Sequence, residues 1–163
     1  MGNVRRIRSI EDLRKPTRSV LQAARNRHGR EGEALVAAWL RDHGYRMVEK
    51  CEVAFRKGAD GELHARGKVS GDFRAVGIDG QSVLVEVKSH AGSLPHGAFR
   101  VHQLEALSAH SSFGGLSLIA WVDTTFEAFP RLHVWDWRQI PAKFVKGSSL
   151  IAGAAGPELK GRK

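Results

Sequence analysis

Three ionisable residues stand where a sheet normally buries apolar side chains. Asp72 follows Gly71, and after a short turn the largely apolar run 82–87 carries Glu86, with Lys88 just beyond it. Burying such charges is costly unless they pair with one another or hold a cation. Carboxylates are ligands that Mg²⁺ prefers, and a bound divalent cation activates water beside a phosphate. These residue types therefore indicate metal-dependent phosphodiester hydrolysis.

The turn between the two expected strands decides whether Asp72 can reach Glu86. Side chains alternate along a strand, so Glu86 lies on the face opposite the valines that flank it. A two-residue turn at Asp79-Gly80 would send Asp72 to the valine face. A three-residue turn at 78–80, with Gly80 left-handed in a type I turn plus G1 bulge, would pair Asp72 with Glu86. The sequence allows both turns, and the second places two carboxylates about 5 Å apart at Cβ.

Two such carboxylates repel each other unless a cation lies between them. Asp72 and Glu86 are therefore the expected ligands of Mg²⁺, for which Mn²⁺ can substitute, and the Val87 backbone carbonyl is a further oxygen ligand. Lys88 would contact the attacking water or the phosphate oxygens of the transition state. The alternative is an ordinary alternating strand whose charged face is solvated.

Glu33 is the candidate third acid, as a catalytic residue and as a metal ligand, directly or through water. It lies on the apolar stripe near the start of a helix expected over residues 30–43, whereas Glu31 is less well placed. An ordinary first-turn glutamate that favours the helix dipole is the alternative.

The composition indicates a polyanionic partner. The 163 residues include 26 Lys+Arg and 17 Asp+Glu, a net charge of +9, and nine of the basic residues lie among the first 30 positions. An excess of this size most often serves nucleic-acid binding, although a merely soluble basic protein is the alternative. Cys51 is the single cysteine, which excludes a disulfide framework and suits a reducing compartment. With no apolar run of membrane-spanning length and no signal-like start, we expect a cytoplasmic protein (host cytoplasm if phage-encoded) without membrane contact.

The expected order of elements is helix, three strands, helix, strand, strand, which makes a mixed α/β sheet flanked by helices. The helices are expected at residues 18–26, 30–43 and 99–110, and the strands at 46–53, 72–76, 82–89, 116–122 and 132–135. The long crossover from residue 89 to residue 116 favours parallel pairing of the strands it joins. We expect a basic N-terminal arm over residues 1–27, a folded domain over 28–146 with a protruding polar loop or stalk at 54–70, and a flexible tail over 147–163.

Taken in order, these residues resemble the PD-(D/E)xK nuclease superfamily, and within it the Holliday junction resolvases of the archaeal and RecU-like types. The superfamily pattern is a Glu on the first core helix, an Asp at the start of a strand, and Glu-x-Lys on the next strand. The resemblance spans residues 28–136, and its most telling stretches are 29–45, Gly71-Asp72-Phe73, Val85-Glu86-Val87-Lys88-Ser89 and 99–107. Gln103 stands where both resolvase types carry a Gln near the start of a helix. Gly71 departs from the pattern, which has Pro there, and the segment 54–70 is longer than in the archaeal type.

The resemblance implies a restriction-endonuclease-like core and a Mg²⁺-dependent homodimer that nicks a four-way DNA junction at two symmetric sites. In RecU-like enzymes a region comparable to 54–70 is a stalk that enters the junction. Two rivals stay open: a PD-(D/E)xK endonuclease or exonuclease acting on duplex DNA, and a non-catalytic DNA-binding module. The residues expected to contact DNA are Arg25, Arg27, His28, Arg30, Arg56, Lys57, Lys68, Ser89, Arg100 and Gln103. Phosphate contacts of this kind supply affinity rather than sequence preference.

Overall fold

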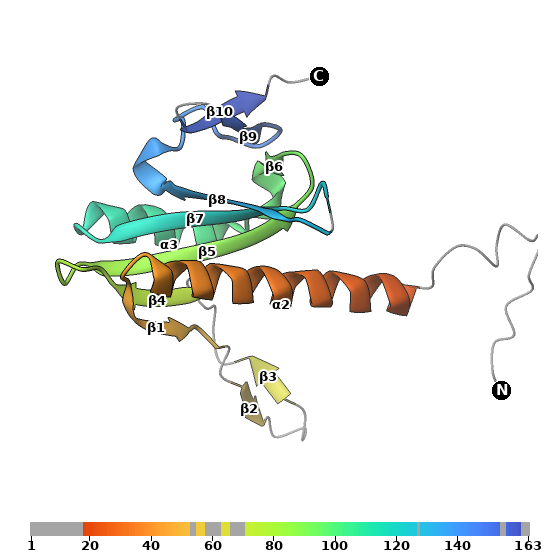
Figure 1. Ribbon diagram of the computed structural model, residues 1–163, viewed down its shortest axis with the longest axis horizontal. Coiled ribbons are helices and arrows are strands. Elements are labelled where there is room, and N and C mark those ends of the chain that lie inside the picture. The colour runs from red at the N-terminus through yellow and green to blue at the C-terminus, as the bar shows by residue number, and fades with distance from the viewer. Residues whose placement is uncertain are drawn as a thin grey trace, which may run out of the picture.

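The computed structural model describes residues 18–52, 55–57, 63–65, 71–126, 128–153 and 156–160 (Figure 1). The elements are α2 (Arg18–Asp42), β1 (Arg46–Lys50), β2 (Phe55–Lys57), β3 (Leu63–Ala65), β4 (Phe73–Val76), β5 (Ser82–His90), β6 (Leu94–Pro95), η1 (His96–Ala98), α3 (Val101–Ser112), β7 (Leu116–Asp123), β8 (Arg131–Asp136), η2 (Trp137–Gln139), β9 (Ser149–Gly153) and β10 (Gly156–Lys160). Among the described residues, no helix combines the length and apolar character needed to cross a bilayer.

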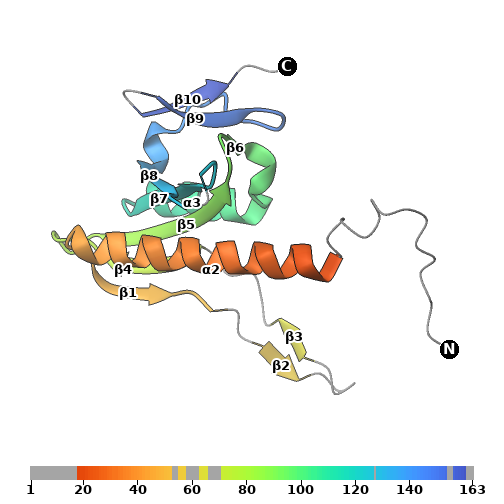
Figure 2. The same cartoon turned by 45° about the vertical axis from the view of Figure 1, so that its right-hand side comes forward.

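A mixed five-stranded sheet forms the centre of this α/β fold, in the order β1-β4-β5-β7-β8. The β5–β7 pair is parallel and the other neighbours are antiparallel. The connection from β5 to β7 contains α3, which confirms the parallel pairing expected from a helical crossover. The helices α2 and α3 lie on opposite faces of the sheet (Figure 2).

Each face of β5 belongs to a different core. The valines of β5 pack with Val36 and Leu40 of α2, and all of these side chains are buried. On the other face, Leu84 shares a cluster with Leu107 of α3 and with Trp121 of β7. Full burial of such side chains contributes about 1.5–3 kcal/mol each. The alternation that buries valines on one face therefore directs Glu86 and Lys88 toward the α3 face.

The first helix differs from expectation, because α2 runs unbroken over 25 residues where we predicted two helices. Residues 18–27 of the expected arm belong to this helix, and residues 1–17 lie outside the described structure. An interior glycine weakens a helix by about 1 kcal/mol but does not end it. Gly32 also has a packing role, since a Cβ there would lie 2.6 Å from Ser89 Oγ and 3.4 Å from Val122 Cγ2. This glycine lets α2 approach the C-terminal end of β5 closely.

The β4–β5 turn is the three-residue turn that the metal-site hypothesis requires. Phe73 pairs with Val85 and Val76 pairs with Ser82, a register that places Asp72 opposite Glu86. The turn at 78–80 is closed by a hydrogen bond from Gly77 N to Gln81 O (2.8 Å). Gly80 has φ +83°, the left-handed conformation expected of it. Of the two turns that the sequence allows, the protein therefore has the three-residue one.

The protruding segment at 54–70 contains a small antiparallel hairpin, in which β2 pairs with β3. Both views show this hairpin apart from the five-stranded sheet, beyond β1 (Figures 1 and 2). Residues 53–54, 58–62 and 66–70 lie outside the described structure. The strand expected at 46–53 ends earlier, since β1 stops at Lys50 and residues 51–52 are not in a strand.

The C-terminal segment is a correction to the flexible tail that we expected from residue 147. β9 pairs with β10 and with β6 in a separate three-stranded sheet. Leu150 has an exposed fraction of 0% and lies in the core cluster on the α3 face. The Gly/Ala/Ser-rich composition hid this hairpin, because its few apolar side chains obtain their partners only through tertiary contacts.

Replacing Leu150 by Ala should destabilise the protein by about 2–5 kcal/mol, because it leaves a cavity in the α3-side core. Urea unfolding followed by circular dichroism measures the change. Ile151→Ala on the same strand is the matched control, because Ile151 is only partly buried and should cost less. Equal, small effects of the two substitutions would show that the C-terminal hairpin does not pack onto the domain.

Candidate active site

The predicted catalytic residues lie around the C-terminal half of β5. An open depression of about 610 Å³ there is lined by Glu33 of α2, Asp72 and Lys88, together with His28, Gly29, Val87, Ser89, His90 and Thr124. Glu86 lies beneath this surface with an exposed fraction of 0%. Three of the four predicted catalytic residues thus border one hollow, and the fourth is buried in contact with Lys88.

Asp72 is placed by the point at which β4 begins. Gly71 has φ +76°, which a proline cannot adopt, so the departure from the PD motif is a conformational requirement here. A Cβ on Gly71 would also lie 2.7 Å from Leu84 Cδ1 and 3.0 Å from Val85 O. The Asp72 carboxylate Oδ2 then accepts a hydrogen bond from Val87 N (2.7 Å). The carboxylate thus replaces a strand carbonyl as the partner of β5.

Glu86 is a buried carboxylate in which only one of the two oxygens has a hydrogen-bond partner. Its Oε1 accepts a hydrogen bond from Lys88 Nζ (2.6 Å), whereas Oε2 is buried and has no partner in the described structure. Burial above all, and then the negative charge of Asp72, raises the pKa of Glu86 to about 7, against the opposing effects of Lys88 and Gln103. An orphaned buried oxygen of this kind is unusual in a native core.

The Asp72 carboxyl is also held above its ordinary pKa, chiefly because it is buried, although the Val87 N–H and Lys88 oppose this. Both pKa values are raised chiefly because burial disfavours the charged form, and the nearby Lys88 offsets this only in part. Within the described residues, no group of three or more His, Cys, Asp or Glu side chains is gathered closely enough to hold a metal by itself. Asp72 and Glu86 are neighbours across the strand pair, and the charge of Asp72 acts on Glu86.

Lys88 is held by the start of α3. Its Nζ donates to Gln103 Oε1 (3.1 Å) and lies 5.3 Å from the centre of the Phe99 ring. Gln103 Oε1 also accepts from the backbone N of Arg100 (2.9 Å), which caps the helix. Gln103, which we expected to contact DNA, thus positions the lysine in this structure.

Glu33 is paired with a residue that the sequence reasoning missed. Lys50 Nζ donates to Glu33 Oε2 (2.5 Å), and this hydrogen bond is the main cause that raises the pKa of Lys50. The β1–β4 register shifts near Met47, which has φ +48°, so that Lys50 pairs with Phe73 on the α2 face. Without that bulge Lys50 would face away from Glu33. No pattern in the sequence predicted the bulge.

The remaining predicted contacts are spread around this depression. His28 and Ser89 line it, and Ser89 Oγ is buried without a partner in the described structure. Glu31 contacts His28 (3.6 Å) instead of the acids. Arg30 borders an adjoining hollow that includes Glu33 and Lys50. Arg27 and Arg100 are exposed, whereas the side chains of Arg25, Arg56, Lys57 and Lys68 lie outside the described structure.

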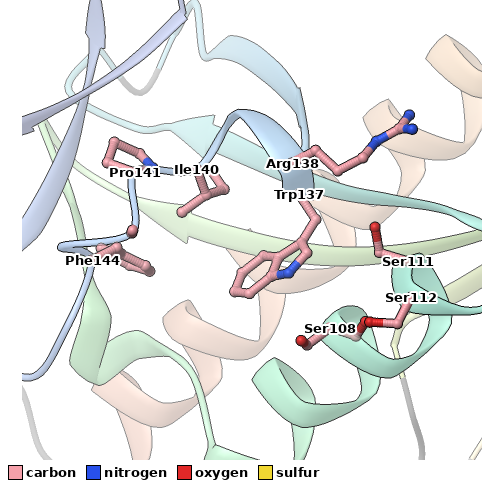
Figure 3. A pocket seen from close by; sticks show the side chains of 9 residues that line it. Ser108, Ser111, Ser112, Trp137, Arg138, Ile140, Pro141 and Phe144 are labelled. Carbon is pink, nitrogen blue, oxygen red and sulfur yellow. The ribbon is translucent and has the colours of Figure 1, made fainter.

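A second hollow of about 470 Å³ lies on the α3 side and has a different character (Figure 3). Ser108, Ser111 and Ser112 of α3 face the Trp137 ring, with Ile140–Phe144 on the far side, and none of the acids lines it. The guanidinium of Arg138 extends away from it and bonds to Asp136. This hollow therefore brings together none of the predicted catalytic residues.

Comparison with known proteins adds no assignment, since neither a scan against protein-family models nor a search of the curated proteins finds a match.

The buried carboxyl of Glu86 should make stability fall as pH rises. Its pKa is about 7 in the folded protein against 4.5 for the ordinary group, so the folded state holds the proton more tightly between these values. The contribution of Glu86 to stability is greatest below pH 4.5 and declines as pH rises to about 7, by on the order of 3 kcal/mol. Glu86→Gln should remove that decline.

The measurement is urea unfolding at a series of pH values, in chelator, with each variant compared with the wild type. Glu105→Gln on α3 is the matched control, because Glu105 is exposed. Parallel pH profiles for the wild type and Glu86→Gln would contradict a strongly raised pKa.

Proposed function

We propose that this protein is a Mg²⁺-dependent DNA endonuclease of the PD-(D/E)xK type that resolves four-way junctions, with a restriction-endonuclease-like core. The observation that carries the proposal is the cross-strand placement of Asp72 opposite the buried Glu86, whose Oε2 has no partner, beside Lys88. A solvated strand face would leave these groups exposed. In most native structures the buried polar atoms of an ion pair are all hydrogen-bonded, so the orphaned oxygen favours a further ligand.

The donor set fits a hard divalent cation. Asp72 and Glu86 would hold it, and the Val87 carbonyl points to the same side of β5 as the Val87 N–H that Asp72 contacts. Glu33 would join directly or through water after exchanging its Lys50 partner. When bound, Mg²⁺ supplies Lewis-acid stabilisation of the scissile phosphate and a water of lowered pKa.

The chain's own residues orient the reacting groups. Lys88 donates to Glu86 and to Gln103, lies beside the Phe99 ring and also lines the depression. The third N–H of its ammonium therefore remains for a group in the depression. There it would donate to the attacking water or to a phosphate oxygen as charge develops. Asp72, fixed by the Val87 N–H, keeps its second oxygen for the site. Lys88 is thus preorganised before substrate binds.

The surroundings favour a large polyanion. The N-terminal half of α2 extends beyond the sheet at the end where the site lies (Figure 1). Arg27 and Arg30 are exposed on that half, and the net charge of +9 supports phosphate binding. A homodimer would present two such sites to the approximate two-fold symmetry of a four-way junction. The salt dependence of binding should be steep.

The test is incubation with Mg²⁺ and either a synthetic four-way junction or a linear duplex of matching sequence. Paired nicks in the junction, on opposite strands, with the duplex left intact, are the expected result. Cutting of the duplex, or degradation from its ends, would contradict junction resolution and would indicate a different nuclease activity at the same site. Binding without any cutting would leave a DNA-binding module and overturn the proposed enzyme.

Mg²⁺ should also raise the melting temperature of the wild type at pH 8, because a ligand that binds only the folded state stabilises it, by about 2.7 kcal/mol at 100 times its Kd. Asp72→Asn and Glu86→Gln should lose both this shift and cleavage while they retain junction binding. Glu31→Gln is the matched control, since Glu31 lies outside the depression. Loss of DNA binding along with cleavage would mean that these acids hold the fold rather than a metal.

A further inference from the structure

Two exposed phenylalanines stand on the connection between β7 and β8. Phe126 has an exposed fraction of 59% and Phe129 of 80%. Figure 1 places this connection at the end of the sheet where β5 terminates, which is the end of the carboxylate site. Phe129 N donates to Phe126 O (3.0 Å), so one tight turn carries both residues. Exposed apolar patches commonly mark binding sites.

The start of this connection is tied firmly to β5. Asp123 Oδ1 accepts hydrogen bonds from Gly92 N (2.8 Å), Thr125 N (3.0 Å) and Thr125 Oγ1 (2.6 Å). Thr124 N donates to the carbonyl of His90 (3.3 Å), two residues beyond Lys88. Burial raises the pKa of Asp123, but the bonds from Thr125 and Gly92 outweigh it and keep the group ionised. The segment that carries the phenylalanines is thus anchored beside the site.

The carboxylate depression adjoins a smaller hollow that reaches Pro130, next to Phe129 in the chain. Thr124 and His28 line the carboxylate depression and also this smaller hollow of about 210 Å³. Leu35 of α2 and Pro130, the neighbour of Phe129, form part of the apolar wall of this smaller hollow. A strand whose phosphate lies at Lys88 would therefore have a partly apolar path toward the β7–β8 connection.

The charge beside the rings suits nucleic acid. The guanidinium of Arg131 lies 5.9 Å from the centre of the Phe126 ring, so one group offers a flat face and the other a positive charge. Nucleobases stack on aromatic side chains, and arginine contributes cation–π and phosphate contacts. Apolar side chains of this type also separate base steps in bent DNA.

Resting on the proposed function, we propose that Phe126 and Phe129 form a stacking platform for a base that is unpaired or splayed next to the scissile phosphate. The platform supplies the preference for branched DNA, because a continuous duplex offers no free base face without the cost of unstacking. Arg131 holds the adjoining phosphate. The acids then cut near the branch.

The test measures affinity in Ca²⁺ without Mg²⁺, so that binding is separated from cleavage, for a four-way junction and a linear duplex. Base–aromatic stacking contributes about 1–3 kcal/mol per base, so the Phe126→Ala/Phe129→Ala double variant should bind the junction roughly tenfold or more weakly. Its affinity for the duplex should stay unchanged. The matched control is Phe113→Ala, with an exposed fraction of 92% at the end of α3.

Phe126→Trp/Phe129→Trp should retain junction affinity, since tryptophan also stacks. Equal junction affinity of the alanine variant and the wild type overturns the platform, even if cleavage is normal. An equal loss for junction and duplex overturns it too, as does a changed oligomeric state in sedimentation, which would make the patch a contact between two copies. If the alanine variant selectively loses junction binding but the wild type never cuts DNA, the platform is supported and the proposed nuclease is refuted.

Discussion

The full burial of the Glu86 carboxylate is the constraint on which the rest of the site depends. A lone charge at this depth would be strongly destabilising, so the fold must supply either a proton or positive charge. Lys88, two positions along the same face of β5, supplies one partner at 2.6 Å. The second oxygen keeps no partner in the described structure. This incomplete compensation is a stability cost typical of functional sites.

Two departures from regular structure bring the surrounding groups to that carboxylate. The left-handed Gly71 lies just before the start of β4, where Asp72 contacts Val87 N through its side chain. The bulge near Met47 turns Lys50 toward Glu33. A regular β1–β4 ladder would place Lys50 on the other face. Irregular backbone here positions charge, which is the use to which such features are most often put.

The site and the β7–β8 connection are linked through the ends of two parallel strands. Parallel pairing of β5 with β7 places Lys88 beside Trp121 and His90 beside Asp123. The C-terminal ends of both strands therefore open on the same edge of the sheet. Ligands of open α/β sheets commonly bind at such an edge, because the loops that follow the strands converge there. The acids and the exposed phenylalanines thus share a rigid support.

The sequence by itself determined the strand pair and its charged face. Strand alternation depends on neighbouring residues and was enough to fix the face that carries Glu86. The sequence allowed two turns, however, and the structure selected the one that places Asp72 opposite Glu86. Tertiary structure alone decided the unbroken α2, the packed C-terminal hairpin and the Glu33–Lys50 pair. Each of these depends on a contact between distant segments, and long-range packing overrides the local preferences from which a sequence is interpreted.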